Sequence, residues 1–178
     1  PPGMTSSDVV VRVRRKLGKG AKVGHAGTLD PEASGVLPLM IGRAARLFDY
    51  LVDKEKTYIA EIAFGIATDT QDSYGKVTET DPNCRVTREM LEDVLPKFVG
   101  RQKQTAPAYS ALKVDGRKMY DLARAGEAVP EKIREITIHG LRLMEQTGDN
   151  RYLIEVRCSR GTYIRTLAFD IGAALGVP

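Results

Sequence analysis

Residues 56–64, KTYIAEIAF, carry an apolar side chain at every second position. That period of two is typical of a β-strand with one buried face. The face that we expect to be buried carries Tyr58, Ala60, Ile62 and Phe64, and the opposite face carries Thr57, Ile59, Glu61 and Ala63. Residues 134–145 and 151–158 alternate in the same way and are joined by the turn QTGDN, which predicts a hairpin.

Helices are predicted before, between and after these strands in the sequence, because apolar residues recur there at helical spacing. They cover residues 7–17, 43–52, 87–98 and 164–175, with a short helical piece near 117–124. Ser6 is the expected N-cap of the first helix and Asp8 lies in its acidic first turn, while Thr87 is the expected N-cap of the third. The apolar run Val36–Ile41 is predicted to be a short buried strand.

Helices and strands interleave without a strict β-α-β rhythm, which favours an α+β fold. We expect one domain with a mixed, largely antiparallel central sheet flanked by helices, since 178 residues suffice for a single core. Residues 101–133 are polar and basic, and an exposed excursion from this domain is the simplest interpretation of them.

The composition excludes several classes of protein. Lys and Arg total 27 against 23 Asp and Glu, and the whole excess lies in the first 50 residues. A second basic stretch covers residues 97–124, so RNA or DNA is a reasonable partner, although solvated faces would give the same pattern. Two distant cysteines and two histidines favour neither a disulfide framework nor a metal centre. Without a signal peptide or an apolar run near the roughly 20 residues of a membrane span, we expect a cytoplasmic protein.

Residues 24–39, GHAGTLDPEASGVLPL, contain the most conspicuous polar side chains. Asp30 precedes Pro31, which is typical of a helix N-cap. Any helix that follows is a turn or so long, so the alternative is a carboxylate that acts on an anionic substrate from a glycine-rich loop. His25 is either a base-contacting imidazole or a loop residue bonded to nearby backbone. The local sequence leaves both interpretations open for Asp30 and for His25.

Charged and aromatic residues outside this loop also allow two interpretations. Tyr58 is either a core aromatic of its strand or a platform on which a base stacks. Arg165 lies near the start of the last predicted helix, where a cation is slightly unfavourable. It has either a fixed acidic partner or only solvent around it. Lys113, Arg117 and Arg124 would by default be solvated charges of the excursion.

The segment GHAGTLDPEASGVL, residues 24–37, closely resembles the catalytic motif of the TruB family of pseudouridine synthases. Four further segments resemble other motifs of that family and occur in the family's order. They are PPGMTSSDVV (1–10), KTYIAEIAFGIATDTQDSYGKV (56–77), QTAPAYSALKVDGRKMYDLARAG (104–126) and CSRGTYIRTLAFDIGAALG (158–176). The resemblance implies the pseudouridine synthase fold, with an RNA-binding thumb inserted at about residues 101–133. It also implies that residues 1–178 are a partial catalytic domain, truncated at both ends and without the C-terminal RNA-binding module.

The resemblance further implies a reaction and roles for single residues. The T-loop uridine (position 55) of tRNA would become pseudouridine by base flipping, cleavage of the glycosidic bond and reattachment through C5. Asp30 matches the family's nucleophilic aspartate, Tyr58 its active-site tyrosine, and Arg165 the arginine that pairs with the aspartate. His25 matches the histidine that helps to take the base out of the loop. The other RNA-binding residues that we expect are Lys22, Gly27, Thr28, Lys113, Arg117, Arg124 and Tyr163.

The same resemblance implies that the partner is the T-arm of tRNA and that the enzyme works without a cofactor or a metal. We expect a monomer with no membrane association. One alternative is a non-catalytic module of the same fold that binds and folds tRNA. Another is a hydrolase that cuts a nucleoside bond, but such enzymes usually need two facing carboxylates, and Glu32 is a poor candidate for the second.

Overall fold

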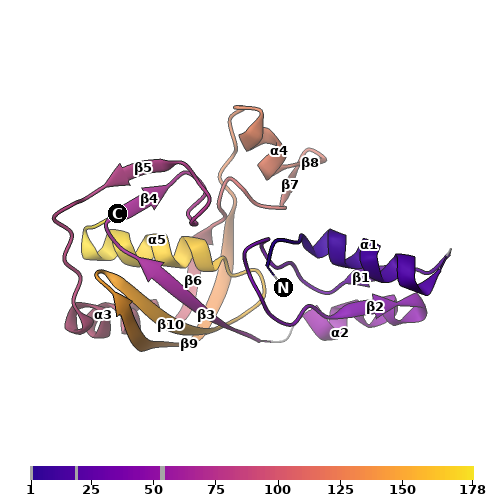
Figure 1. Cartoon of the computed structure of the whole chain (residues 1–178), viewed down its shortest axis with the longest axis horizontal. Coiled ribbons are helices and arrows are strands. Elements are labelled where there is room, and N and C mark those ends of the chain that lie inside the picture. The colour runs from indigo at the N-terminus through magenta and orange to yellow at the C-terminus, as the bar shows by residue number, and fades with distance from the viewer. Residues whose placement is uncertain (1, 19, 53–54) are drawn as a thin grey trace. The chain divides into compact units, whose positions relative to one another are not determined.

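The computed structural model describes residues 2–18, 20–52 and 55–178, and the chain divides into two compact units, residues 1–54 and 55–178. Every strand in these described ranges pairs within its own unit (Figure 1). Within the same ranges, no helix has the length and apolar character to cross a membrane. The two longest helices, α1 (Ser6–Leu17) and α5 (Ile164–Leu175), have 12 residues each.

The first unit places α1 beside a two-stranded antiparallel sheet. Its remaining elements are β1 (Val23–His25), β2 (Leu39–Ile41), the 3₁₀ helix η1 (Gly42–Leu47) and α2 (Phe48–Val52). The N-cap of α1 is Thr5 and not Ser6, so that prediction was wrong. The Thr5 hydroxyl accepts the Asp8 N–H at 3.1 Å, and the Asp8 carboxylate accepts the Thr5 N–H at 2.9 Å. This reciprocal capping box requires an acid three residues after the cap, and Asp8 has that spacing only from Thr5.

Two further predictions for the first unit need correction. The buried strand expected over Val36–Ile41 is confined to β2, and the Val36 side chain is 89% exposed. Pro38 has no N–H to donate to a strand ladder, and its carbonyl instead accepts the Ala26 N–H at 2.9 Å. The helix expected over residues 43–52 begins as the tighter η1 and becomes α-helical only in α2.

The second unit is built on a four-stranded sheet whose order is β3-β10-β9-β6, with every pairing antiparallel. The strands are β3 (Lys56–Ala63), β10 (Arg151–Cys158), β9 (Ile133–Gly148) and β6 (Gly100–Thr105). The predicted hairpin is confirmed as β9 and β10, although β9 continues to Gly148 and so shortens the turn. Asn150 in that turn has φ 54°, a left-handed conformation that asparagine tolerates.

Helices pack on one face of this sheet and enclose the core. They are α3 (Arg88–Val94), the 3₁₀ helix η2 (Leu95–Phe98) and α5, and Figure 1 shows α5 lying across the strands. The Thr87 hydroxyl accepts the Met90 N–H at 3.3 Å, which confirms Thr87 as the N-cap of α3. The predicted buried face of β3 points into this core. The largest fully buried side chains are Tyr152, Leu91, Met119, Ile138, Ile154, Leu167, Ile171, Val156 and Cys158.

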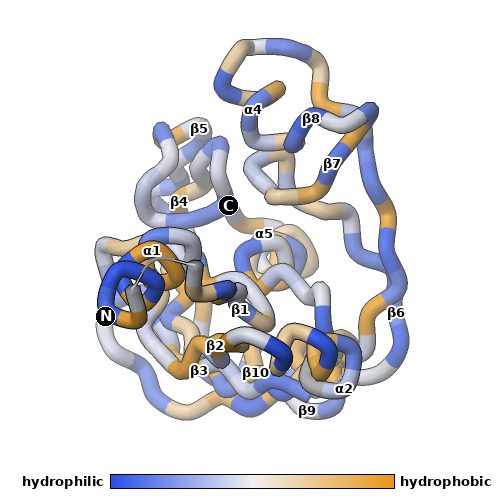
Figure 2. Tube along the Cα trace, turned by 90° about the vertical axis from the view of Figure 1, so that its right-hand side faces the viewer, coloured by the Kyte–Doolittle hydropathy of each residue, from blue (hydrophilic) through white to orange (hydrophobic). Residues whose placement is uncertain are grey.

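Two short hairpins leave the core of the second unit. One joins β4 (Ile66–Thr68) to β5 (Val77–Thr80), and the other joins β7 (Lys113–Val114) to β8 (Arg117–Lys118). Helix α4 (Met119–Arg124) follows β8, so the helix expected near 117–124 begins two residues late. Figures 1 and 2 both show β7, β8 and α4 projecting from the unit, and Figure 2 shows hydrophobic and hydrophilic positions alternating there. The excursion predicted over residues 101–133 was wrong at its start, because residues 101–105 belong to β6 of the central sheet. Met119 and Leu122 are the buried side of the projecting part.

Candidate active site

Asp30 lies on a turn that the N-terminal segment holds on both sides. The Ser6 hydroxyl accepts the Leu29 N–H at 3.0 Å and donates to the Leu29 carbonyl at 3.2 Å. The Gly3 N–H donates to the Pro31 carbonyl at 2.7 Å. These bonds fix the residues immediately before and after Asp30, whose own side chain is exposed.

No helix begins after Asp30, so its interpretation as a helix N-cap was wrong. Only a single turn follows, in which the Ala33 N–H donates to the Asp30 carbonyl at 2.9 Å. Gly35 and Pro38 lie in the extended chain that leads to β2, and neither residue favours a helix. The turn therefore presents a carboxylate from a loop that is anchored at both of its neighbours.

His25 is the last residue of β1, and its Nδ1 bonds the Gly27 carbonyl. The structure therefore contains the local backbone bond that was one of the two interpretations of this side chain. Gly27 has φ 127°, a backbone conformation that side-chain-bearing residues rarely adopt. Lys22 and Thr28 flank this bend with exposed side chains. The bend thus gathers four of the predicted RNA-binding residues around β1.

Tyr58 and Arg165 belong to the second unit, where they come from different elements. Tyr58 lies in β3, half-buried against the core, as its strand periodicity predicted. Arg165 is the second residue of α5, and its side chain is only 14% exposed. It is therefore not a solvated cation.

Arg165 joins three segments of the second unit. Its Nη1 donates to the Thr70 carbonyl at 3.1 Å and to Asp72 Oδ2 at 3.2 Å, and its Nη2 donates to the Tyr109 carbonyl at 3.1 Å. The fixed acidic partner suggested by its position in the helix is thus present as Asp72. Backbone carbonyls supply the other two acceptors, so the planar guanidinium is held in one orientation.

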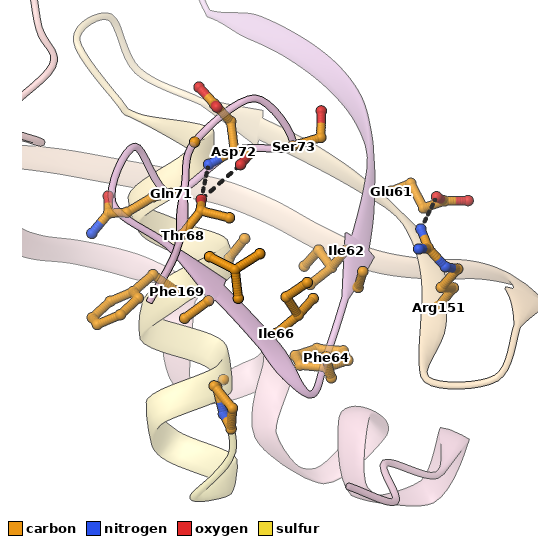
Figure 3. A pocket seen from close by; sticks show the side chains of 17 residues that line it. Glu61, Ile62, Phe64, Ile66, Thr68, Gln71, Asp72, Ser73, Arg151 and Phe169 are labelled. Atoms are coloured by element: carbon orange, nitrogen blue, oxygen red, sulfur yellow. Dashed lines mark hydrogen bonds and ion pairs between the residues drawn. The ribbon is translucent and has the colours of Figure 1, made fainter. Parts of the chain in front are cut away.

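Asp72 was missed from the sequence, where residues 65–77 indicated only turns. Its Oδ1 accepts the Thr70 hydroxyl at 2.6 Å and the Tyr74 N–H at 3.1 Å, so both carboxylate oxygens are engaged. The Thr68 hydroxyl donates to the Asp72 carbonyl at 2.7 Å and accepts the Asp72 N–H at 3.1 Å (Figure 3). The available signal was the run TDTQDSYG, because Asp and Thr side chains bonding their own backbone are typical of tight turns.

A cavity of about 470 Å³ lies beside this turn, between β3, β4 and α5. Its walls are mostly apolar and include Ile66 and Phe169, while Gln71 and Asp72 lie at its polar end (Figure 3). Neither Tyr58 nor Arg165 lines it among the described residues. This cavity therefore adjoins the turn that supports Arg165 rather than the predicted catalytic side chains.

Tyr163 precedes α5 as its N-cap residue and is held by a buried side chain. Gln104, which is 3% exposed, donates its Nε2 to the Tyr163 carbonyl at 3.0 Å. The Gln104 Oε1 accepts the Tyr163 N–H at 2.8 Å. Because one amide holds both backbone groups of Tyr163, the start of α5 is fixed relative to β6.

The predicted basic residues of the excursion differ in their surroundings. Lys113 is exposed on β7, whereas Arg117 makes a two-pronged ion pair with Glu127, with both N–O distances at 2.8 Å. That hydrogen-bonded pair lowers the pKa of Glu127 and raises the pKa of Arg117. The guanidinium of Arg124 lies 5.4 Å from the centre of the Tyr120 ring. Two of the three cations are thus not simply solvated.

The described part of the chain contains no cluster of three or more His, Cys, Asp or Glu side chains that could hold a metal ion. The titratable groups that the site brings together are instead an aspartate and an arginine, in the pair Asp72–Arg165.

Comparison with known proteins identifies relatives across the whole chain. The model of the "TruB family pseudouridylate synthase (N terminal domain)" matches residues 14–164. A tRNA pseudouridine synthase B of Azoarcus sp. is 51% identical over 99% of the chain, and one of Oceanobacillus iheyensis is 49% identical over all of it. The chain spans 58% and 59% of the length of these two relatives.

Solved structures show the same fold. A chain from a Cbf5–Nop10–Gar1 complex matches 99% of this chain with a TM-score of 0.73 and 29% identity. A chain from an H/ACA RNP bound to a substrate RNA containing 2′-deoxyuridine matches 99% with a TM-score of 0.69 and 27% identity. The matches cover 43% and 41% of those longer chains.

Proposed function

Because this chain belongs to the TruB family of pseudouridylate synthases, we propose that the protein containing it converts a uridine of tRNA into pseudouridine. The observation that carries the proposal is the similarity to tRNA pseudouridine synthase B over the whole chain. The proposed target is the T-loop uridine at position 55. An RNA loop suits an enzyme that flips its target base out of the stack. Flipping costs a few kcal/mol in a duplex and less in a loop, where the base is not paired.

The proposed reaction is an isomerisation. The N-glycosidic bond between N1 and C1′ breaks, the uracil turns in the pocket, and C5 forms the new bond to C1′. C5 then loses a proton and N1 carries one in the product, so no atom is gained or lost overall. No electrons pass to another molecule and no group is donated, so the proposal includes no cofactor and no metal. The enzyme would act as a monomer in the cytoplasm.

Asp30 is the proposed nucleophile. A carboxylate is a competent covalent nucleophile when it is ionised and held in position. Support for this role comes from its turn, in which Ser6 and Gly3 bind the backbone of Leu29 and Pro31 on either side. A loop anchored in this way presents the carboxylate with little freedom.

Arg165 is proposed as the cation that keeps Asp30 ionised and oriented during the reaction. The support is its preorganised geometry, because Asp72, the Thr70 carbonyl and the Tyr109 carbonyl all hold one guanidinium. A cation fixed before substrate binds needs no reorganisation when charge develops, and such donors contribute most to catalysis.

The remaining residues would bind RNA. Tyr58 would stack on the flipped base and lie near the proton lost from C5, and His25 would help to extrude the base. Lys22, Gly27, Thr28 and Tyr163 would contact the same loop. The part of residues 101–133 that follows β6 would form a thumb that grips the T-arm, with Lys113, Arg117 and Arg124 facing phosphates. Such contacts make affinity fall as salt rises.

The test is to incubate the complete protein with unmodified tRNA and to measure pseudouridine and free uracil. We expect pseudouridine from the wild type and none at a comparable rate from Asp30→Asn. Asp49→Asn is the matched control, since Asp49 is an exposed aspartate of the same unit that the proposal does not use. Equal rates from Asp30→Asn and the wild type would contradict the role of Asp30. Free uracil would favour the hydrolase, and tRNA binding without any product would favour the non-catalytic module.

A further inference from the structure

Side chains from two neighbouring strands of the sheet, β6 and β9, contact Tyr163. Gln104 of β6 binds its backbone N–H and carbonyl, as described above. Arg134 of β9 is the register partner of Gln104, so both side chains leave the sheet on the same face. The Cζ of Arg134 lies 5.9 Å from the centre of the Tyr163 ring.

The guanidinium of Arg134 also lies against the backbone of Gly161. A Cβ atom on Gly161 would lie 2.6 Å from Nη2 and 2.7 Å from Cζ, which is far closer than such atoms approach. Gly161 has φ +76°, a conformation that favours glycine, and a side chain there would displace the Arg134 guanidinium. The guanidinium therefore lies near both the backbone of Gly161 and the ring of Tyr163.

Within the described residues, no carboxylate forms an ion pair with Arg134. Among the described residues it makes no ion pair or hydrogen bond, although its side chain is half-buried. Its nitrogens remain accessible to solvent, because no buried side-chain nitrogen in the described residues lacks a partner. The contact that its geometry shows is thus the cation–π contact with Tyr163, which the planar guanidinium makes in a geometry that lysine does not reproduce.

We propose that Arg134 is a positioning residue that sets the orientation of the Tyr163 ring. Gln104 fixes the backbone of Tyr163, and Arg134 restricts the side chain that this backbone carries. The inference deepens the proposed function, since it rests on Tyr163 contacting the target loop of tRNA. A ring held in one orientation would guide the flipped nucleotide, so Arg134 would affect the rate of modification more than the affinity for tRNA.

The first experiment compares the complete wild-type protein with Arg134→Gln and Arg134→Lys. We expect Arg134→Gln to slow single-turnover pseudouridine formation roughly 10- to 100-fold, the range that small misplacements of substrate produce. The dissociation constant for tRNA should change less than about twofold, because Arg134 contacts no RNA in this account. Arg134→Lys should be intermediate, since it keeps a positive charge near the ring but loses the planar guanidinium. Arg142→Gln is the matched control, an exposed arginine of the same strand.

The second experiment combines Arg134→Gln with Tyr163→Leu in a double-mutant cycle. If Arg134 acts through Tyr163, the double variant is no slower than Tyr163→Leu alone. Additive losses would overturn the inference. So would a fall in tRNA affinity with a shallower salt dependence, which would make Arg134 a phosphate contact.

The outcomes also separate this inference from the proposed function. A wild type without pseudouridine formation overturns both, whereas an active wild type with an equally fast Arg134→Gln overturns only the role of Arg134. Thermal unfolding of each variant identifies a general loss of structure. If Arg134→Gln does not fold, the folded Arg134→Lys variant in the same cycle decides the question.

Discussion

Arginines in two regions of the second unit differ in their exposure and in the groups that they bind. On the outer face of the sheet, arginines pair with carboxylates on neighbouring strands, as in Arg142–Glu155 at 3.2 Å, where the side chains are 63% and 37% exposed. Arg101–Glu135 and Arg151–Glu61 repeat the arrangement. At the start of α5, Arg165 has a side chain that is only 14% exposed and shares its guanidinium between one carboxylate and two backbone carbonyls.

This difference indicates which charged side chains can be replaced with little loss of stability. Exposed ion pairs contribute between about 0 and 1 kcal/mol, because water and salt already stabilise each partner. A mostly buried guanidinium with fixed acceptors costs desolvation and offers a preorganised cation in return. The outer face is therefore where a charge can be lost at little cost in stability, and the start of α5 is where we expect charge to act on a substrate.

Replacement of Arg165 should have the largest effect. We expect Arg165→Gln to slow pseudouridine formation by about 10²- to 10³-fold, the usual cost of removing one preorganised donor. Single-turnover assays of the complete protein would measure it, with tRNA affinity followed in parallel. Arg142→Gln is the control from the outer face and should react at the wild-type rate. Similar losses in both variants would remove the distinction between the two regions.

The turn that supports Arg165 should be the next most sensitive. A Cβ on Gly75 would lie 2.3 Å from Thr70 Oγ1 and 2.8 Å from Thr68 Cβ, and both threonines are hydrogen-bonded in place. We expect Gly75→Ala to lower the free energy of unfolding by about 1–3 kcal/mol, as overpacking does. Denaturant unfolding would measure this. Gly140→Ala is the control, since nothing lies within 4 Å of its Cβ position, and equal stability of the two variants would contradict the prediction.

A smaller effect is expected at Asp170 of α5, where burial raises the pKa of the carboxyl. Above its ordinary pKa the unfolded chain loses this proton while the folded protein keeps it. The stability contributed by Asp170 therefore falls as pH rises through the raised pKa of the folded state. Asp170→Asn should flatten this slope and raise the melting temperature at neutral pH, whereas Asp93→Asn, at an exposed aspartate, should not. An unchanged slope in Asp170→Asn would show that other groups cause it.

The smallest effect is expected on the outer face. Arg142→Gln, Glu155→Gln and the double variant should each change the free energy of unfolding by less than about 1 kcal/mol. The coupling from that double-mutant cycle should shrink further in high salt, because both side chains are exposed. A coupling energy as large as that of a buried ion pair would contradict the expectation that charges on the outer face contribute little to stability.

The sequence predicted the elements whose pattern is local. Strand β3, the hairpin of β9 and β10, and helix α5 are confirmed, because a period of two or of 3.6 describes which side of each is buried. Local pattern was insufficient where two residues offered the same chemistry, and so Ser6 was chosen in place of Thr5. It also failed for Val36–Ile41, where apolar character was taken as burial although Val36 is exposed.

The candidate site was predictable only in part. The resemblance of GHAGTLDPEASGVL to the family's motif singled out Asp30, while local physics favoured a helix cap that the structure does not contain. The resemblance implied that Arg165 pairs with Asp30, and its ion pair with Asp72 was not predicted, because Asp72 lies 93 residues earlier in a stretch of turns. Long-range ion pairs of this kind depend on how β4, β5 and α5 pack against one another. That packing cannot be predicted from a short window of sequence.

In the proposed reaction, Asp30 and Arg165 act as one unit on the uridine. The most direct measurement is tritium release from tRNA labelled at uridine C5, followed over long times for Asp30→Asn, Arg165→Gln and the double variant of the complete protein. When two residues act as a unit, removing either one abolishes the shared contribution to the rate, and removing the second costs nothing more. We therefore expect the double variant to release tritium no more slowly than Asp30→Asn alone. Losses that multiply in the double variant would contradict the claim, because they would mean that Arg165 acts independently of Asp30.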